Sequence, residues 1–143
     1  TPDDLEARAH MMSAAAMGAT AFQKGLGAIH AMSHPVGAVF NTHHGTTNAV
    51  CMPAVLAFNA DTIRGRFDQA AAYLGIDGGF DGFCEFVQQF NDSFAIPRTL
   101  TEMGVSEDRL DDLVAMALED PSCGGNPVEL TADGLRGLFR ACF

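Results

Sequence analysis

Four of the five histidines of this chain lie between residues 25 and 59, in a stretch without a single carboxylate. These histidines are His30, His34, His43 and His44. No Asp or Glu occurs anywhere between Ala7 and Ala60, and the stretch is otherwise apolar and rich in glycine. Neutral imidazole is a good ligand for divalent metals. The stretch is therefore either a metal site or a group of hydrogen-bonded structural histidines.

The spacing of the histidines indicates how they could meet. His30 and His34 are four residues apart, so a helix would place both rings on one face. Pro35 disfavours continuation of that helix, and a turn is expected through residues 40–42. The next helix would open at His44, so a helix, a reversal and a second helix would return His44 to the side of His30. This arrangement predicts two or three imidazoles around one divalent cation.

The nature of the metal depends on its other ligands. Three histidines without a carboxylate would suit zinc. A harder metal needs an oxygen ligand, and the histidine stretch does not contain one.

The composition limits the partners and the compartment. The formal net charge is −10, which argues against nucleic-acid and anionic-membrane partners because both require basic patches. The four cysteines are scattered and contain no C-x-x-C pair, which predicts a reduced, cytoplasmic chain. Only three of the 18 acidic residues precede Asp61, so we expect the amino-terminal part to be buried or covered by a partner. A homo-oligomer is compatible with that surface.

Periodicity predicts an all-α fold, a bundle of about six or seven helices without strands. Helices are expected over about residues 1–24, 45–58, 61–74, 107–118 and 131–142, with Thr1, Asp61, Ser106 and Thr131 as their N-caps. Pro53 is expected to kink the second of these helices. A stripe at helical spacing is interpreted as core: Phe80, Phe83, Phe86, Val87, Phe90 and Phe94.

Several motif pieces occur together in the histidine stretch. They are GLGAIH at 25–30, AMSHPVG at 31–37, HG at 44–45 and MPAVLAFN at 52–59. With the spacing of fourteen residues between His30 and His44, the run resembles the metal-binding signature of the iron-containing, NAD(P)-dependent alcohol dehydrogenases. Residues 103–143 resemble the carboxyl end of the same family.

The resemblance implies a role for each histidine. His30 and His44 would be metal ligands, with Fe²⁺ as the first choice of metal and Zn²⁺ as the alternative. His34 would lie beside the nicotinamide of NAD or NADP and beside the substrate, as the catalytic and cofactor-binding residue that relays a proton or positions the ring. His43 would lie beside the site or at the surface.

The resemblance also implies a domain organisation. Residues 1–143 would form one all-α metal-binding domain, the carboxyl-terminal part of a dehydroquinate synthase-like fold. The α/β domain that binds the dinucleotide would precede Thr1, together with the remaining metal ligands, an Asp and a His four residues later. Alone, this piece is expected to be inactive.

The expected function is hydride transfer between a small alcohol or aldehyde and NAD(P). Two alternatives stay open. One is a non-catalytic helical binding or assembly domain with structural histidines. The other is a related reductase, of the maleylacetate type or a zinc-dependent polyol dehydrogenase.

Overall fold

The computed structural model describes all residues from 1 to 143 and consists of helices and their connections, which confirms the all-α prediction. The six α-helices are α1 (Leu5–Ala21), α2 (Ala28–Phe40), α3 (His44–Leu74), α4 (Gly79–Ser93), α5 (Leu110–Glu119) and α6 (Ala132–Cys142). Four short 3-10 helices lie between them: η1 (Phe22–Lys24), η2 (Thr101–Met103), η3 (Glu107–Arg109) and η4 (Pro121–Gly125). None of the helices combines the length and apolar character needed to cross a bilayer.

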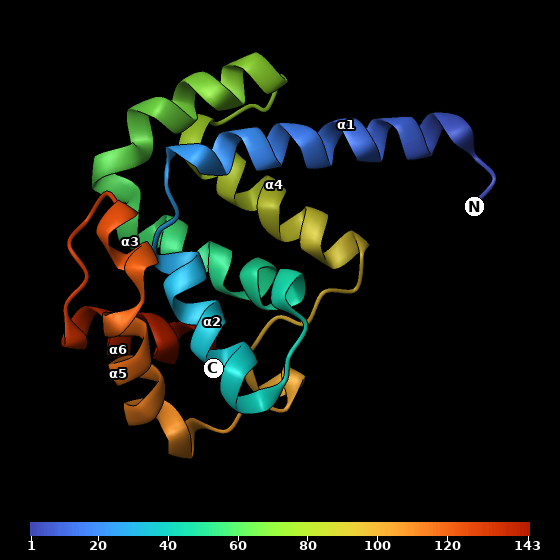
Figure 1. Ribbon diagram of the computed structural model, residues 1–143. Coiled ribbons are helices and arrows are strands. Elements are labelled where there is room, and N and C mark those ends of the chain that lie inside the picture. Colours follow the sequence, from blue (N-terminus) through green and yellow to red (C-terminus); the bar gives the residue numbers. More distant parts are fainter.

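The main core lies where α2, α3, α5 and α6 meet (Figure 1). Its largest fully buried side chains include Phe139, Met32, Leu100 and Leu113. A smaller apolar cluster, Leu56, Ile63, Phe80 and Val87, joins α4 to the middle of α3. The two helices that carry the histidines, α2 and α3, are therefore both held by the main core.

The prediction that Pro35 ends the first histidine helix is wrong. Helix α2 continues through Pro35 to Phe40, and Asn41, with φ of 53°, ends it. Proline removes one backbone hydrogen bond from a helix, but α2 presents a fully buried face that includes Ala28, Met32 and Val36. Burial of this face outweighs the local cost of the proline.

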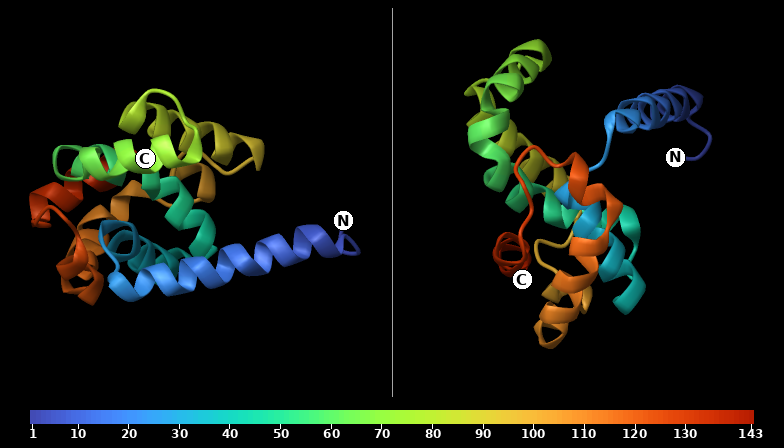
Figure 2. Two further views of the ribbon diagram at one scale, coloured as in Figure 1. Left: turned by 90° about the horizontal axis from the view of Figure 1, so that it is seen from above. Right: turned by 60° about the vertical axis from the view of Figure 1, so that its left-hand side comes forward.

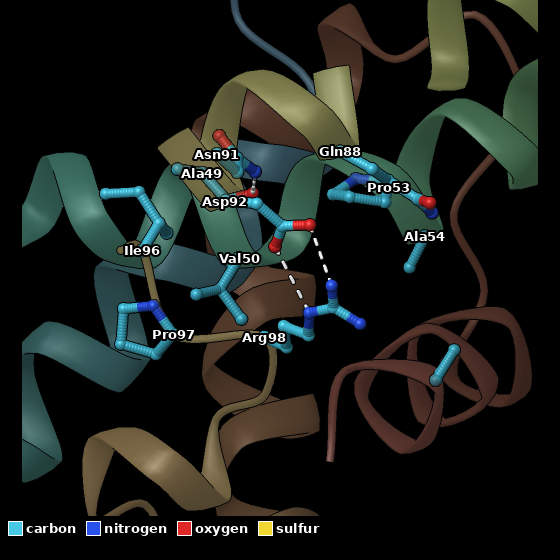
Figure 3. Close-up of a pocket in the computed structure, with 11 residues that line it drawn as sticks. Ala49, Val50, Pro53, Ala54, Gln88, Asn91, Asp92, Ile96, Pro97 and Arg98 are labelled. Carbon is cyan, nitrogen blue, oxygen red and sulfur yellow. Dashed lines mark hydrogen bonds and ion pairs between the residues drawn. The ribbon is translucent and has the colours of Figure 1, made fainter. Parts of the chain in front are cut away.

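Residues 45–74 form one helix instead of the predicted two, so Asp61 is not an N-cap. Pro53 leaves the carbonyl of Ala49 without its intrahelical donor, and Asn91 of α4 replaces that donor with an Nδ2···O distance of 3.0 Å (Figure 3). The ribbon of α3 changes direction along its length (Figures 1 and 2), as expected of a helix loosened by proline.

Helix α1 projects from the rest of the chain (Figure 2), and none of its residues is buried. The expectation that the part before Asp61 is buried is therefore confirmed for α2 and much of the first half of α3, and wrong for α1 within this chain. The helix begins at Leu5, because Asp4 and not Thr1 is the N-cap and accepts a hydrogen bond from the Ala7 N–H. Thr131, by contrast, caps α6 as predicted.

The aromatic stripe of α4 is only partly core. Phe80 and Val87 are buried, whereas Phe86, Phe90 and Phe94 are 42%, 53% and 65% exposed. Successive rings still contact one another along the helix, with centroids 5.7 Å apart for Phe86 and Phe90. The periodicity correctly predicts one aromatic face, but α4 reaches beyond the elements that could cover it.

The substitution Asn91→Ala is expected to lower the free energy of unfolding by about 1–2 kcal/mol, because the Ala49 carbonyl loses its only donor. Gln89→Ala is the matched control, since it removes an amide of the same helix that bonds only the exposed Glu85. Denaturant titration of the complete protein measures both. The substitution Pro53→Ala restores the backbone N–H at residue 53. In that background, Asn91→Ala should lower the free energy of unfolding by a smaller amount. Equal losses for Asn91→Ala and Gln89→Ala would refute this account of α3.

Candidate metal centre

Three imidazole rings meet where α2 lies beside the first turn of α3. The centroid of the His30 ring lies 5.2 Å from that of His44 and 5.7 Å from that of His34, and the His34 and His44 rings are 5.5 Å apart and stacked. The predicted return of His44 to the side of His30 is therefore confirmed. His34 joins them because it lies one helical turn after His30 on the same face of α2.

Asn48 lies between two of the rings. Its Nδ2 is 3.4 Å from Nε2 of His30 and 3.1 Å from Nε2 of His44. Both Nε2 atoms therefore lie close to one side-chain amide. Two imidazole nitrogens that converge in this way match the arrangement in which a pair of histidines binds a divalent cation through their lone pairs.

The electrostatics favour the neutral form of His30. Burial, followed by repulsion from His44 and His34, lowers the pKa of His30 below its ordinary value, while Asp120 acts in the opposite direction. Only the deprotonated imidazole binds a metal, so a lowered pKa favours the ligating form.

His43 has a different function in the fold. Its Nδ1 accepts the Thr46 N–H at 3.2 Å, so it is the N-cap of α3, and it lies at the surface. Its Nδ1 is therefore used at the helix end and not at the three clustered rings.

Asp120 approaches the cluster from the end of α5. Its Oδ2 lies 2.7 Å from Nδ1 of His34, and its side chain is only 12% exposed. Burial by itself raises the pKa of Asp120, but hydrogen bonds from Ser122 and His34 outweigh burial and hold this pKa below its ordinary value. The carboxylate is therefore ionised and accepts a hydrogen bond from the His34 ring.

The loop that carries Asp120 is fastened to the start of α2. The side-chain oxygen of Asn126 accepts the Ala28 N–H at 3.1 Å, and its amide forms a reciprocal pair with buried Asn59 at 2.9 and 3.0 Å. Gly125 passes so close to Leu26 that an added Cβ would collide with the Leu26 carbonyl oxygen. The loop therefore holds α2 near its beginning through Asn126 and near His34 through Asp120.

These residues fit part of a metal shell. No group of three or more His, Cys, Asp or Glu side chains in this chain is arranged to hold a metal ion by itself. His30 and His44 form a converging pair, and Oδ1 of the intervening Asn48 is buried without a hydrogen-bond partner. A converging pair of imidazoles beside an unsatisfied amide suits part of the ligand shell of a divalent cation.

A cavity of about 230 Å³ lies elsewhere, between α3, α4 and the loop at Pro97 (Figure 3). None of its lining residues is a histidine, and its one cation, Arg98, is paired with Asp92 at 2.7 and 3.1 Å. We therefore place the candidate site at the histidine cluster and not at this cavity.

Sequence reasoning missed two residues of this site, Asn48 and Asp120. Asn48 follows His44 by four residues, so helical periodicity was a sufficient signal for it. Asp120 is separated from His34 by 86 residues, and only its N-cap position before Pro121-Ser122 sets it apart from other surface acids. No local pattern connects Asp120 with the histidines.

Comparisons with known proteins show what this chain is similar to. The family model "Fe-containing alcohol dehydrogenase family, C-terminal" matches residues 1–143. The 4-hydroxybutyrate dehydrogenase of Cupriavidus necator is 42% identical over 145 residues, which cover 95% of this chain and 38% of that protein. The NADPH-dependent butanol dehydrogenase of Clostridium saccharobutylicum is 32% identical over 98% of this chain and 39% of its own length. The solved structure of a 1,3-propanediol oxidoreductase superposes with a TM-score of 0.77 at 28% identity, over 82% of this chain and 33% of that one.

The substitution Asn126→Ala is expected to destabilise the protein by about 2–4 kcal/mol, because it leaves Asn59 and the Ala28 N–H without partners. Asn126→Asp keeps the acceptor oxygen but turns a carboxylate oxygen toward the Asn59 and Val128 oxygens, so it should also destabilise the protein. Denaturant midpoints of the two variants and the wild type measure the series. A loss below about 0.5 kcal/mol for Asn126→Ala would mean that the loop is not fastened through this amide.

Proposed function

Because this chain belongs to the iron-containing alcohol dehydrogenase family, we propose that it is the helical, metal-binding part of an oxidoreductase that transfers hydride between a small alcohol and its carbonyl form, with NAD or NADP as the acceptor or donor. The observation that carries the proposal is the convergence of the His30 and His44 Nε2 atoms on the Asn48 amide, at 3.4 and 3.1 Å.

His30 and His44 hold the cation in this proposal. Fe²⁺ is our first choice, because the family is named for iron, and Zn²⁺ is the alternative that imidazole also suits. When bound, the cation supplies Lewis-acid polarisation of the substrate oxygen. The amide of Asn48 now lies between the two Nε2 atoms, so Asn48 would turn aside when a cation is bound.

His34 transfers the proton in this proposal. The ring stacks on His44 and is 43% exposed, so it is reachable from outside the chain and adjacent to the proposed metal position. Its Nδ1 is held by Asp120, which leaves Nε2 to accept or deliver a proton at the substrate hydroxyl. We therefore propose His34 as the catalytic residue, placed beside the nicotinamide in the complete protein.

The rest of the site is proposed to come from outside this chain. The chain spans 38% and 39% of the length of the two relatives, so their remaining length can hold the dinucleotide-binding domain and the missing ligands. Residues 1–143 would then be a single helical domain. The wholly exposed α1 and the exposed phenylalanines of α4 are the surfaces available to pack against such a domain or against a second copy.

A second candidate function is a helical assembly domain whose histidines are structural. The exposed apolar residues of α1, among them Met11, Met12 and Met17, favour it. Metal content separates the two candidates, because an assembly domain needs no cation at its histidines.

The substitutions His30→Ala and His44→Ala are each expected to lower the metal affinity of the complete protein at least about tenfold, because each removes a direct ligand. His43→Asn is the matched control, since it removes an imidazole of the same stretch and keeps a residue that caps α3. Metal bound per protein, measured by mass spectrometry after dialysis against buffered Fe²⁺ or Zn²⁺, checks the set. Unchanged metal content in both alanine variants would favour the assembly domain.

The substitution His34→Ala is expected to leave metal content unchanged and to lower kcat about 10²-fold, because a proton-transfer group contributes about 10²–10⁴ in rate. Alcohol-dependent reduction of NAD and of NADP by the complete protein, at saturating alcohol, measures the change. Wild-type turnover in His34→Ala would remove the catalytic role from this residue.

A further inference from the structure

The contact between His34 and Asp120 supports an inference that goes beyond the metal site of the family. We propose that Asp120 is a positioning residue that fixes the tautomer and the orientation of the His34 ring. The proposal deepens the proposed function and depends on it, since it concerns how the same site moves a proton.

The first step concerns the hydrogen between the two groups. Oδ2 of Asp120 lies 2.7 Å from Nδ1 of His34, within hydrogen-bond distance. An ionised carboxylate can only accept, so the hydrogen belongs to Nδ1 of His34. A neutral His34 therefore has its lone pair on Nε2, which is the form required to accept a proton. The lowered pKa of Asp120 agrees with an ionised carboxylate.

The second step concerns how rigidly the carboxylate is held. Its other oxygen, Oδ1, accepts the Ser122 N–H at 2.8 Å, and the Asp120 carbonyl accepts the Cys123 N–H at 3.0 Å. The same loop is fastened to α2 through Asn126, whose oxygen accepts the Ala28 N–H. Asp120 is thus fixed relative to the helix that carries His34, and not merely adjacent to its ring.

The third step excludes a simpler role. Asp120 is the nearest acid to the cluster, so it could be the oxygen ligand that the histidine stretch lacks. Its Oδ1 is engaged by Ser122 and its Oδ2 by His34, and it does not complete a metal-holding group with the histidines. Both oxygens face protein donors, which assigns Asp120 to the ring and not to the cation.

Asp120→Asn is the decisive substitution because the structure dictates how the amide must turn. The Ser122 N–H is a donor, so the amide oxygen takes the Oδ1 position and continues to cap η4. The NH₂ group is then left facing Nδ1 of His34, which must accept. The hydrogen of the neutral ring moves to Nε2, and the ring can no longer accept a proton there.

The first measurement uses ¹⁵N-histidine NMR of the complete protein, metal-free, with the His34 signals assigned by their absence in His34→Gln. The wild type is expected to show Nδ1 as the protonated nitrogen and Nε2 as the bare one, and Asp120→Asn is expected to show the reverse. The wild-type result does not depend on whether Asp120→Asn folds. A wild-type ring protonated on Nε2, or an unchanged tautomer in Asp120→Asn, would overturn the proposal.

The second measurement is kinetic. Asp120→Asn is expected to lower kcat about 10²-fold, with KM for the alcohol within about threefold and metal content unchanged. In a His34→Ala background the same substitution should change kcat by less than about twofold, because Asp120 acts through His34. A similar loss in both backgrounds would mean a general structural role, and loss of metal would mean that Asp120 is a ligand; either result contradicts the proposal.

The two proposals fail in different ways. If His34→Ala retains wild-type turnover, the proposed catalytic role of His34 fails, whereas the tautomer assigned to Asp120 is still decided by NMR. If His34→Ala lowers kcat and Asp120→Asn does not, the proposed function stands and the role of Asp120 is rejected.

Discussion

The close approach of α2 to the first turn of α3 is the constraint on which the histidine cluster depends. Three residues make the reversal: Asn41 ends α2 in the left-handed region, Thr42 bonds Thr47 at 2.8 Å between their hydroxyls, and His43 caps α3. Helix α2 packs against the core through its fully buried face, which includes Ala28, Ala31 and Met32. The ring positions therefore follow from backbone geometry fixed by burial, before any cation is bound.

Polar groups around the cluster are used to orient rings, and apolar burial supplies the stability. Asn48 lies close to two Nε2 atoms, Asp120 bonds one Nδ1, and Asn126 fastens the loop that carries Asp120. Away from the cluster, α1 and the end of α4 expose apolar side chains that this chain does not cover. In the proposed function, these surfaces are available to pack against another domain.

How much of the fold and of the candidate site could be predicted from the sequence depends on how far apart in the sequence the contacting residues lie. The spacing of His30 and His44 predicts their meeting, because the turn between them is local. The continuation of α2 through Pro35 and of α3 through Pro53 was not predicted, because buried packing and the Asn91 side chain decide it. Asp120 could not be placed beside His34, because its position depends on how α5 packs against α2. The exposed rings of Phe90 and Phe94 were misassigned because periodicity predicts a face and not what covers it.

The most direct test of the central claim is anomalous diffraction from crystals of the complete protein grown with Fe²⁺ or Zn²⁺. The account predicts one anomalous peak within about 2.0–2.3 Å of Nε2 of both His30 and His44, with Asn48 turned away from the position between them. A peak that lies outside coordination distance of either ring, or its absence from the cluster in metal-replete crystals, would contradict it.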